Sequence, residues 1–290
     1  MRNWVIIISI LLTLICALSL LKRKQNKHRI CVLISGFAPR GLKYTYKTIQ
    51  QRIIDKLKLT YDTVDVFHYS FISKNGKIDS HRTNEDQIQI NNDDVNLLNV
   101  KQLRTDYQED IKLEEYITKT CETSVIHPIN PLRELYQEYM TSKFPIQNYD
   151  ACVLLWSDGY MLRDINIEHV ENVIANNNLL YTTGHNKWGG IANKFYISSP
   201  RIILLLAQRL FHLSERCYKL NGKKENPEKF LEWWINDLQI ENRETDMFYV
   251  KIRNNLYTTW QNKLENFLKK NPSMNDLFEL ENDGRYKLKV

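Results

Sequence analysis

The residues with the clearest chemical potential follow a short apolar segment in the middle of the chain. Residues 151–156 have the sequence A-C-V-L-L-W, and Ser157, Asp158 and Gly159 come directly after them. Six consecutive apolar residues bounded by polar ones predict a strand of a sheet that is covered on both faces. Ligands of open α/β sheets gather beyond the carboxyl ends of the strands, so Asp158 is a candidate for holding a metal or a phosphate group. The alternative is a plain turn, because turns favour Ser, Asp and Gly.

A second candidate is Arg40, which lies in the loop G-F-A-P-R-G at residues 36–41. An apolar, β-branched run at residues 29–35 predicts a strand before this loop, and residues 42–57 carry apolar side chains at helical spacing after it. A further strand is predicted at residues 64–69, which completes a βαβ unit. The loop can bring Arg40 close to a bound phosphate, and a solvated loop arginine is the alternative.

The rest of the chain continues this alternation of strands and helices. Helices are expected to begin at Pro131 and Asn226 and to cover residues 165–174, 199–218 and 257–268, and strands are expected at residues 95–100, 179–183, 192–197 and 247–252. About 260 residues follow the first thirty, which is enough for one α/β domain with a large core. We place this domain at residues 30–270 and a peripheral charged tail at residues 271–290.

The amino-terminal segment is apolar enough to interact with a membrane. Residues 4–21 carry no charge and are close to the shortest length that crosses a bilayer, so they predict a single-pass anchor. A cleaved signal peptide is the alternative, because residues 17–19 resemble a small-x-small cleavage site. Basic residues are concentrated at positions 22–29, after the apolar run, and the positive-inside rule therefore predicts a cytosolic domain, with the lumenal side as the alternative.

Net charge and cysteine content indicate which partners and which redox state to expect. The formal net charge is +6, and the basic cluster behind the anchor is explained by anionic lipid headgroups, so no nucleic-acid partner is expected. The five cysteines suggest no paired framework and are expected to be reduced thiols. The one N-x-Ser/Thr motif, at residues 271–273, is blocked by its proline.

The order of these segments resembles a GT-A-type glycosyltransferase group that is found in large DNA viruses, algae and bacteria. The matching segments, spread over residues 30–254, are C-V-L-I-S-G, K-Y-T-Y-K-T-I, D-V-F-H-Y, N-P-L-R-E-L-Y, Y-D-A-C-V-L-L-W-S-D, N-K-F-Y-I-S-S, P-E-K-F-L-E-W-W-I and F-Y-V-K-I-R. The resemblance implies a GT-A-like, mostly parallel sheet flanked by helices, with a nucleotide-sugar donor at its carboxyl edge. It also implies that Mn²⁺ or Mg²⁺ bridges the donor diphosphate to Asp158, because a hard cation requires oxygen ligands.

The same resemblance implies roles in donor binding for Gly36, Arg40, Asp65, Asn193 and Lys194. Asp65 would contact ribose or uracil, with a structural role at the sheet edge as the alternative. The chain also departs from the family pattern at two places. Trp156 stands where the family usually has an arginine, and Asn193 stands where it often has an acid.

Roles toward the acceptor are expected for residues of a glycine-rich loop and of a helix start. His185 and Trp188 are candidates for binding an acceptor glycan, lipid or protein, with ordinary loop residues as the alternative. Glu228 and Glu232 are candidates for a general base, although the helix dipole favours glutamate at such positions in any case. The two departures from the pattern favour a competing hypothesis, a membrane-tethered binding or structural protein with a degenerate GT-A-like fold.

Overall fold

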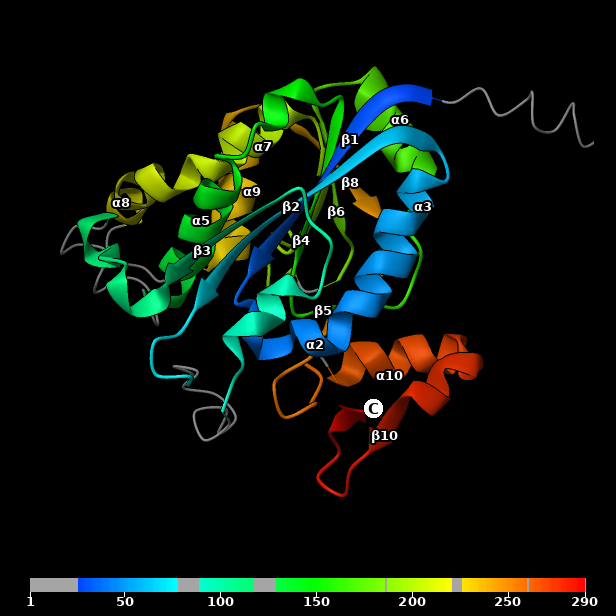
Figure 1. The fold of residues 1–290 in the computed structure, drawn as a ribbon. Helices are drawn as coiled ribbons and strands as arrows, with labels where there is room; N and C mark the ends of the chain where they lie inside the picture. The colour runs from blue at the N-terminus through cyan, green and yellow to red at the C-terminus, as the bar shows by residue number, and fades with distance from the viewer. Residues whose placement is uncertain are drawn as a thin grey trace, which may run out of the picture.

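A computed structural model describes residues 26–77, 89–116, 129–185, 187–220, 226–259 and 261–289. A seven-stranded sheet with the order β3-β2-β1-β4-β7-β6-β8 runs through the middle of the molecule (Figure 1). Its strands are β1 (Asn26–Gly36), β2 (Tyr61–Ile72), β3 (Gln102–Tyr107), β4 (Ala151–Trp156), β6 (Leu179–Thr183), β7 (Phe195–Ser198) and β8 (Glu241–Thr245). Every neighbouring pair is parallel except the two that β7 makes. The predicted α/β class with a mostly parallel sheet is confirmed.

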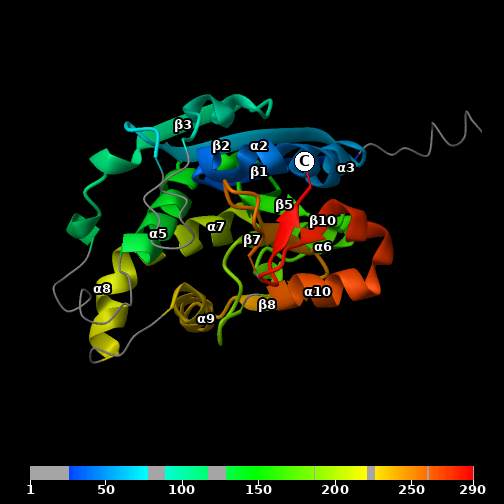
Figure 2. The same ribbon diagram turned by 90° about the horizontal axis from the view of Figure 1, so that it is seen from below.

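Helices cover both faces of this sheet. On one face lies a continuous helical segment made of α2 (Ala38–Ile49), a π-helical turn (Gln50–Ile54) and α3 (Asp55–Lys58), together with α6 (Ile167–Ala175). The other face is covered by α5 (Ile129–Thr141), α7 (Pro200–Ala207) and α9 (Pro227–Asp237), with α8 (Arg209–Lys219) farther out. Figure 2 shows α2 and α3 beside the sheet, with α7, α8 and α9 on its opposite side.

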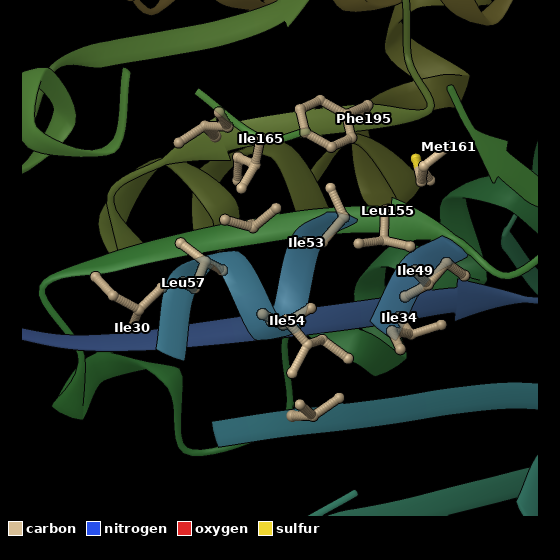
Figure 3. Close-up of a cluster of buried hydrophobic side chains, with 14 of the residues drawn as sticks. Ile30, Ile34, Ile49, Ile53, Ile54, Leu57, Leu155, Met161, Ile165 and Phe195 are labelled. Atoms are coloured by element: carbon tan, nitrogen blue, oxygen red, sulfur yellow. The ribbon is translucent and has the colours of Figure 1, made fainter. Parts of the chain in front are cut away.

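The two-sided cover explains why the central strands are apolar without alternation. In β1, Ile30 and Ile34 belong to the cluster under α2, whereas Leu33 belongs to the cluster under α7 and α9, and all three are fully buried. Figure 3 shows Ile30 and Ile34 in one buried cluster with Ile49, Ile53, Ile54 and Leu57 of the helical segment. Burying one such side chain contributes about 1.5–3 kcal/mol, so these two layers supply most of the force that holds the sheet in place.

The predicted elements differ from the structure at residues 95–100, at β8 and at residues 199–218. The strand expected at residues 95–100 is wrong, because Asn92–Asn96 form a 3-10 turn whose Val95 is buried against the α2 cluster, and the strand lies later, at β3. The edge strand β8 was not predicted, since its sequence E-N-R-E-T is polar and mostly exposed. Short 3-10 turns also occur at Gln108–Asp110, Leu113–Tyr116 and Ile146–Asn148. The single helix expected at residues 199–218 is divided into α7 and α8.

A smaller layer follows the main sheet. The strands β5 (Gly159–Met161) and β9 (Tyr249–Lys251) form an antiparallel pair, and the chain then continues through α10 (Gln261–Lys270), a 3-10 turn (Pro272–Leu277), β10 (Phe278–Leu280) and β11 (Tyr286–Leu288). The β10–β11 hairpin lies within residues 271–290, which were expected to form a peripheral charged tail. Its Phe278 and Leu288 are buried in one cluster with Val250 of β9, so this segment packs on the domain.

The predicted membrane anchor cannot be compared with the structure, whereas the predicted state of three cysteines can. The predicted anchor at residues 4–21 lies outside the described residues, and within those residues no helix is both long and apolar enough to cross a membrane. Cys31 and Cys152 are buried free thiols on neighbouring strands, as expected. Cys217 of α8 is disulfide-bonded, so the expectation of reduced cysteines is wrong at this position.

Candidate functional site

The turn that carries Asp158 is fixed by contacts from three elements. The amide of Ser157 donates a hydrogen bond to the Ser35 carbonyl of β1 at 2.8 Å, and Thr45 Oγ1 of α2 donates to the Ser157 carbonyl at 2.5 Å. The amide of Ile252, just after β9, donates to the Asp158 carbonyl at 2.9 Å. Asp158 is only 7% exposed. The turn is therefore a rigid part of the domain, and Asp158 has a defined position at the carboxyl edge of the sheet.

Gly36 allows β1 to approach this turn closely. Its φ of +130° is a conformation that residues with a side chain rarely adopt, and a Cβ at this position would lie 2.7 Å from Ser157 Oγ. The family resemblance implied a donor-binding role for Gly36. In the structure, this glycine brings the end of β1 against the Asp158 turn.

Basic side chains surround the Asp158 carboxylate. Arg253 Nη1 lies 3.9 Å from Asp158 Oδ2. Burial raises the pKa of Asp158, but four nearby cations outweigh burial and lower the pKa, in the order Lys251, Arg253, Arg40 and Lys194. Asp158 Oδ1 is buried and has no hydrogen-bond partner among the described residues. The structure therefore places Arg40 and Lys194 in one electrostatic cluster with Asp158, which we call the edge cluster.

Two of these cations, Lys194 and Lys251, lie over the ring of Trp156. This ring is buried, and Lys194 Nζ lies 4.1 Å from the ring centroid while Lys251 Nζ lies 5.5 Å from it. Aromatic faces attract ammonium groups at these distances. Positive charge is thus present beside the position where the family pattern has an arginine, although other residues supply it.

Asn193 and Lys194 reach the edge cluster because β7 is the one reversed strand. Its amino end lies at the carboxyl edge of the sheet, where Phe195 pairs with Leu155. Lys194 forms an ion pair with Glu134 of α5, and Asn193 Nδ2 donates to Glu134 Oε2 at 3.2 Å. Burial raises the pKa of Glu134, but Lys194 and Lys251 lower it overall. Sequence reasoning did not select Glu134, because the apolar spacing of its helix identifies only the positions that face the core.

Of the two predicted glutamates, one lies near the cluster. Glu228 is in the first turn of α9, and burial raises its pKa against the opposing charges of Lys194 and Lys251. Burial raises the pKa of Tyr249, and the negative charges of Asp158, Glu228 and Glu134 raise it further. No described hydrogen bond or ion pair joins Glu232, one turn later, to this group.

Asp65 lies away from the edge cluster. It pairs with Cys31 in the middle of β1, which in turn pairs with Cys152 near the amino end of β4, whereas Asp158 follows Trp156, which pairs with Ser35. Asp65 accepts hydrogen bonds from Tyr149 Oη at 2.6 Å and Lys101 Nζ at 2.7 Å. The structure therefore does not bring Asp65 together with the other predicted donor-binding residues.

The two residues of the glycine-rich loop have different surroundings. His185 is buried, with Nε2 at 3.2 Å from the Tyr249 carbonyl oxygen, and burial lowers its pKa to about 4. Its imidazole is neutral at pH 7 and joins the loop to β9. Trp188 is 68% exposed, and its carbonyl accepts a hydrogen bond at 2.8 Å from Asn226, the N-cap of α9. An exposed indole thus lies on the loop that is tied to the start of the helix carrying Glu228.

Asp158 is the one carboxylate of this site that we assign as a possible metal ligand. The described parts of the chain contain no group of three or more His, Cys, Asp or Glu residues that could hold an ion. Asp158 Oδ1 nevertheless fits a hard cation, since Mg²⁺ commonly takes one or two protein carboxylates and completes its coordination with phosphate oxygens and water. Asp158 is the residue that would hold such an ion.

Fold and site together define an α/β protein with a mostly parallel sheet and a compact group of charges at the carboxyl edge of its central strand. No protein-family model matches the sequence. No curated protein matches it either.

Proposed function

We propose that this protein is a membrane-anchored, GT-A-like glycosyltransferase that moves a sugar from a nucleotide-sugar donor to a glycan, lipid or protein acceptor. The observation that carries the proposal is Asp158, a buried carboxylate at the carboxyl edge of β4 that is surrounded by basic side chains and whose Oδ1 accepts no hydrogen bond from the part of the chain that the structure describes. Ligands of parallel sheets collect at this edge. The sheet, with its single reversed strand next to β4, is consistent with a GT-A-like fold.

The donor diphosphate would lie at the edge cluster. Breaking the bond between the anomeric carbon and the phosphate leaves negative charge on the diphosphate, and positively charged groups stabilise that charge as it develops. A bound Mn²⁺ or Mg²⁺, held by Asp158, would act as a Lewis acid on the same oxygens. Lys251 and Arg253 would orient the diphosphate from the β9 side, and Arg40 would do so from the first turn of α2.

The acceptor would approach from the side of α9. Glu228 would accept the proton of the attacking hydroxyl group, and its raised pKa brings it closer to the working pH of a general base. Trp188 would stack on the acceptor, because its indole is exposed and its loop is tied to the start of α9.

At both positions where the chain departs from the family pattern, neighbouring residues supply a charge of the sign that the family residue would carry. Lys194 and Lys251 provide positive charge over the Trp156 ring, and Glu134 places a carboxylate beside Asn193. These neighbours favour an enzyme over the competing hypothesis of a non-catalytic binding protein.

Sugar release and transfer from radiolabelled nucleotide sugars would test the proposal on the full-length protein in detergent. We expect turnover with one donor and a loss of at least about a hundredfold in Glu228→Gln, because general-base catalysis contributes about 10²–10⁴-fold. Glu232→Gln on the same helix is the matched control and should keep most of the activity. Absence of turnover with all common nucleotide sugars would favour the non-catalytic alternative.

The membrane anchor is a separate part of the proposal. If residues 4–21 span a bilayer, alkaline carbonate washing leaves the full-length protein in the membrane pellet, whereas a chain that starts at residue 22 is released. Recovery of a mature chain that begins near Leu20 would instead establish a cleaved signal peptide.

A further inference from the structure

We infer that the amino edge of the main sheet docks on a membrane surface through five basic residues, which we call the amino-edge patch: Lys27, Arg29, Lys58, Lys101 and Lys143. The occupant is the layer of anionic phospholipid headgroups in the membrane that holds residues 4–21. This inference rests on the membrane anchor of the proposed function. It adds a contact between the folded domain and lipid, and it turns the edge cluster away from the bilayer.

The first argument is the length of chain between the predicted anchor and the sheet. The anchor is predicted to end at Leu21, and β1 begins at Asn26, so the four residues 22–25 separate them. Four residues span at most about 14 Å when fully extended. The eleven residues of β1 place its carboxyl end about 30 Å farther along the strand. The short linker therefore holds the amino edge of the sheet, and not the carboxyl edge, close to the headgroups.

The second argument is the place of the basic residues in the fold. Lys27 and Arg29 lie at the start of β1, Lys58 is the last residue of α3 before β2, and Lys143 lies between α5 and β4. Because β1, β2 and β4 are parallel, the segments that lead into them meet at one edge of the sheet. All four side chains are exposed. Figures 1 and 2 both show the start of β1 beside α3.

Tyr149 holds two of the cations in place just before β4. The guanidinium of Arg29 lies 5.1 Å from the centroid of its ring, and Lys101 Nζ lies 3.5 Å from its hydroxyl oxygen. Lys101 also forms an ion pair at 2.7 Å with Asp65, which accepts the hydrogen bond of the tyrosine hydroxyl. Side chains that are already ordered lose less conformational freedom when they bind. These two cations are therefore prepared for contact with headgroups.

The third argument is the distribution of charge along the edge. The carboxylates that we find near the patch in the described part of the chain are Asp62, Asp65, Asp150 and Glu171. The sequence adds three basic residues to the five of the patch, at positions 22–24 directly before β1. Each basic residue close to an anionic surface is attracted to it, so this half of the edge suits anionic lipid.

The other half of the edge, at the start of β6 and β8, has no such excess among the described residues. Its charged side chains are Arg201, Arg243, Asp237 and Glu241, and their charges cancel. Positive charge is thus concentrated on the side where the chain enters the domain.

The turn between α3 and β2 also presents an apolar side chain. Leu59 is 61% exposed and follows Lys58 directly. Apolar side chains next to basic ones fit the boundary between headgroups and acyl chains. Leu59 therefore suits the same lipid surface as the cations around it.

Amine footprinting of the full-length protein in lipid nanodiscs tests the inference. The discs contain phosphatidylcholine alone or with about a third of phosphatidylserine. We expect Lys58, Lys101 and Lys143 to react with a water-soluble acetylating reagent at least about fivefold more slowly in the anionic discs, because each basic residue at an anionic surface gains about this factor. The internal control is the set of lysines on α10, a helix that packs on β9, and these should react equally in both discs: Lys263, Lys269 and Lys270.

A double variant tests whether the charges cause the protection. Neither Lys58 nor Lys143 forms an ion pair within the described ranges, so Lys58→Gln with Lys143→Gln should fold and should lose most of the protection of Lys101. Lys263→Gln with Lys270→Gln is the matched control and should keep it. Melting curves in detergent check both folds. If the first variant does not fold, footprinting of the wild type at about 1 M salt replaces it, because screening at that concentration should also remove the protection.

The outcomes separate the inference from the proposed anchor. Equal labelling of the patch in both kinds of disc, with the protein retained in the discs, would overturn the inference and leave the anchor in place. Protection of the α10 lysines instead would also overturn it, because another face would then lie on the bilayer. Protection that survives the double substitution or high salt would overturn it as well. Loss of the protein from both discs would defeat the anchor together with the inference, whereas sugar transfer tests the enzymatic part of the proposed function independently.

Discussion

Gly41 in the first turn of α2 lies so close to Ile252 that a Cβ on the glycine would be 2.7 Å from the Ile252 carbonyl oxygen. The same Cβ would lie 3.2 Å from Asp158 Cβ. This contact sets how near the helix, and with it Arg40, approaches the Asp158 turn. An outward movement of the helix would increase the distance between Arg40 and the basic residues at the end of β9.

Gly41→Ala should therefore destabilise the protein by about 1–3 kcal/mol through overpacking against rigid backbone. It should also weaken diphosphate binding, because Arg40 would be displaced. Chemical denaturation and titration with pyrophosphate measure the two effects. Gly284→Ala is the control, since Gly284 has a φ of +78° but open space around it, and should cost about 1 kcal/mol from backbone strain without changing affinity. Unaltered stability in Gly41→Ala would contradict the close packing.

Asp158→Asn separates the role of a metal from that of the cations. Asp158 is buried among basic groups, so its neutralisation should cost about 1–3 kcal/mol of stability. A ligand at about a hundred times its dissociation constant stabilises by about 2.7 kcal/mol, which is several degrees in a melting curve. We expect Asp158→Asn to lose the Mn²⁺-dependent part of this shift and to keep or increase the part seen in EDTA. A complete loss of both parts would contradict the assignment of the cations.

Lys251 predicts how diphosphate binding depends on pH. Burial, Lys194 and Arg253 lower its pKa to about 8, although Asp158 and Glu134 oppose this shift. A bound anion raises this pKa, so binding takes up a proton above pH 8 and the affinity should fall as the pH rises from about 8 toward 10. The phosphate groups titrate near pH 6 and do not interfere. Titrations across this range should show the decrease in wild type and a flat profile in Lys251→Met.

The disulfide at Cys217 bears on the compartment of the domain. Structural disulfides persist in oxidising compartments and are rare in the cytosol, whereas the basic residues at positions 22–29 favour a cytosolic domain. Alkylation of the unfolded, unreduced protein followed by mass spectrometry should label Cys31 and Cys152 and leave Cys217 unlabelled. Protease added to sealed microsomes then decides the topology, since digestion beyond Arg29 establishes the cytosolic side and full protection establishes the lumenal side.

Much of the fold could be predicted because local patterns and burial agree. Strands β1, β2, β4 and β6 each contain a continuous buried run, and α9 begins with an Asn cap followed by Pro, so the sequence signals coincide with the structure. The errors occur where packing overrides pattern. Val95 and its neighbours form an apolar run, yet they lie under α2 as a 3-10 turn, and β8 pairs with β6 despite a polar sequence.

The site was predicted only in part. Asp158 was found because a polar turn directly follows an apolar strand, and Arg40 because a glycine-rich loop follows the first strand. Lys251 and Arg253 were not selected, because a strand at residues 247–252 gives no indication of what lies beside it. Glu134 was missed for the same reason on α5. Asp65 was selected from its place in a strand, and the parallel register puts it toward the opposite end of the sheet.

The sequence by itself determined the α/β class, most element boundaries and the position of Asp158 at the end of a buried strand, because periodicity, caps and turns act over a few neighbouring residues. Only the tertiary structure decided which charges meet there. The basic residues around Asp158 lie far apart in the sequence, at Arg40, Lys194, Lys251 and Arg253. Three features of the topology bring them around one carboxylate, namely the order of the strands, the reversal of β7 and the pairing of β9 with β5. Coulomb interactions depend on distance in space, which the spacing of residues along a chain does not contain.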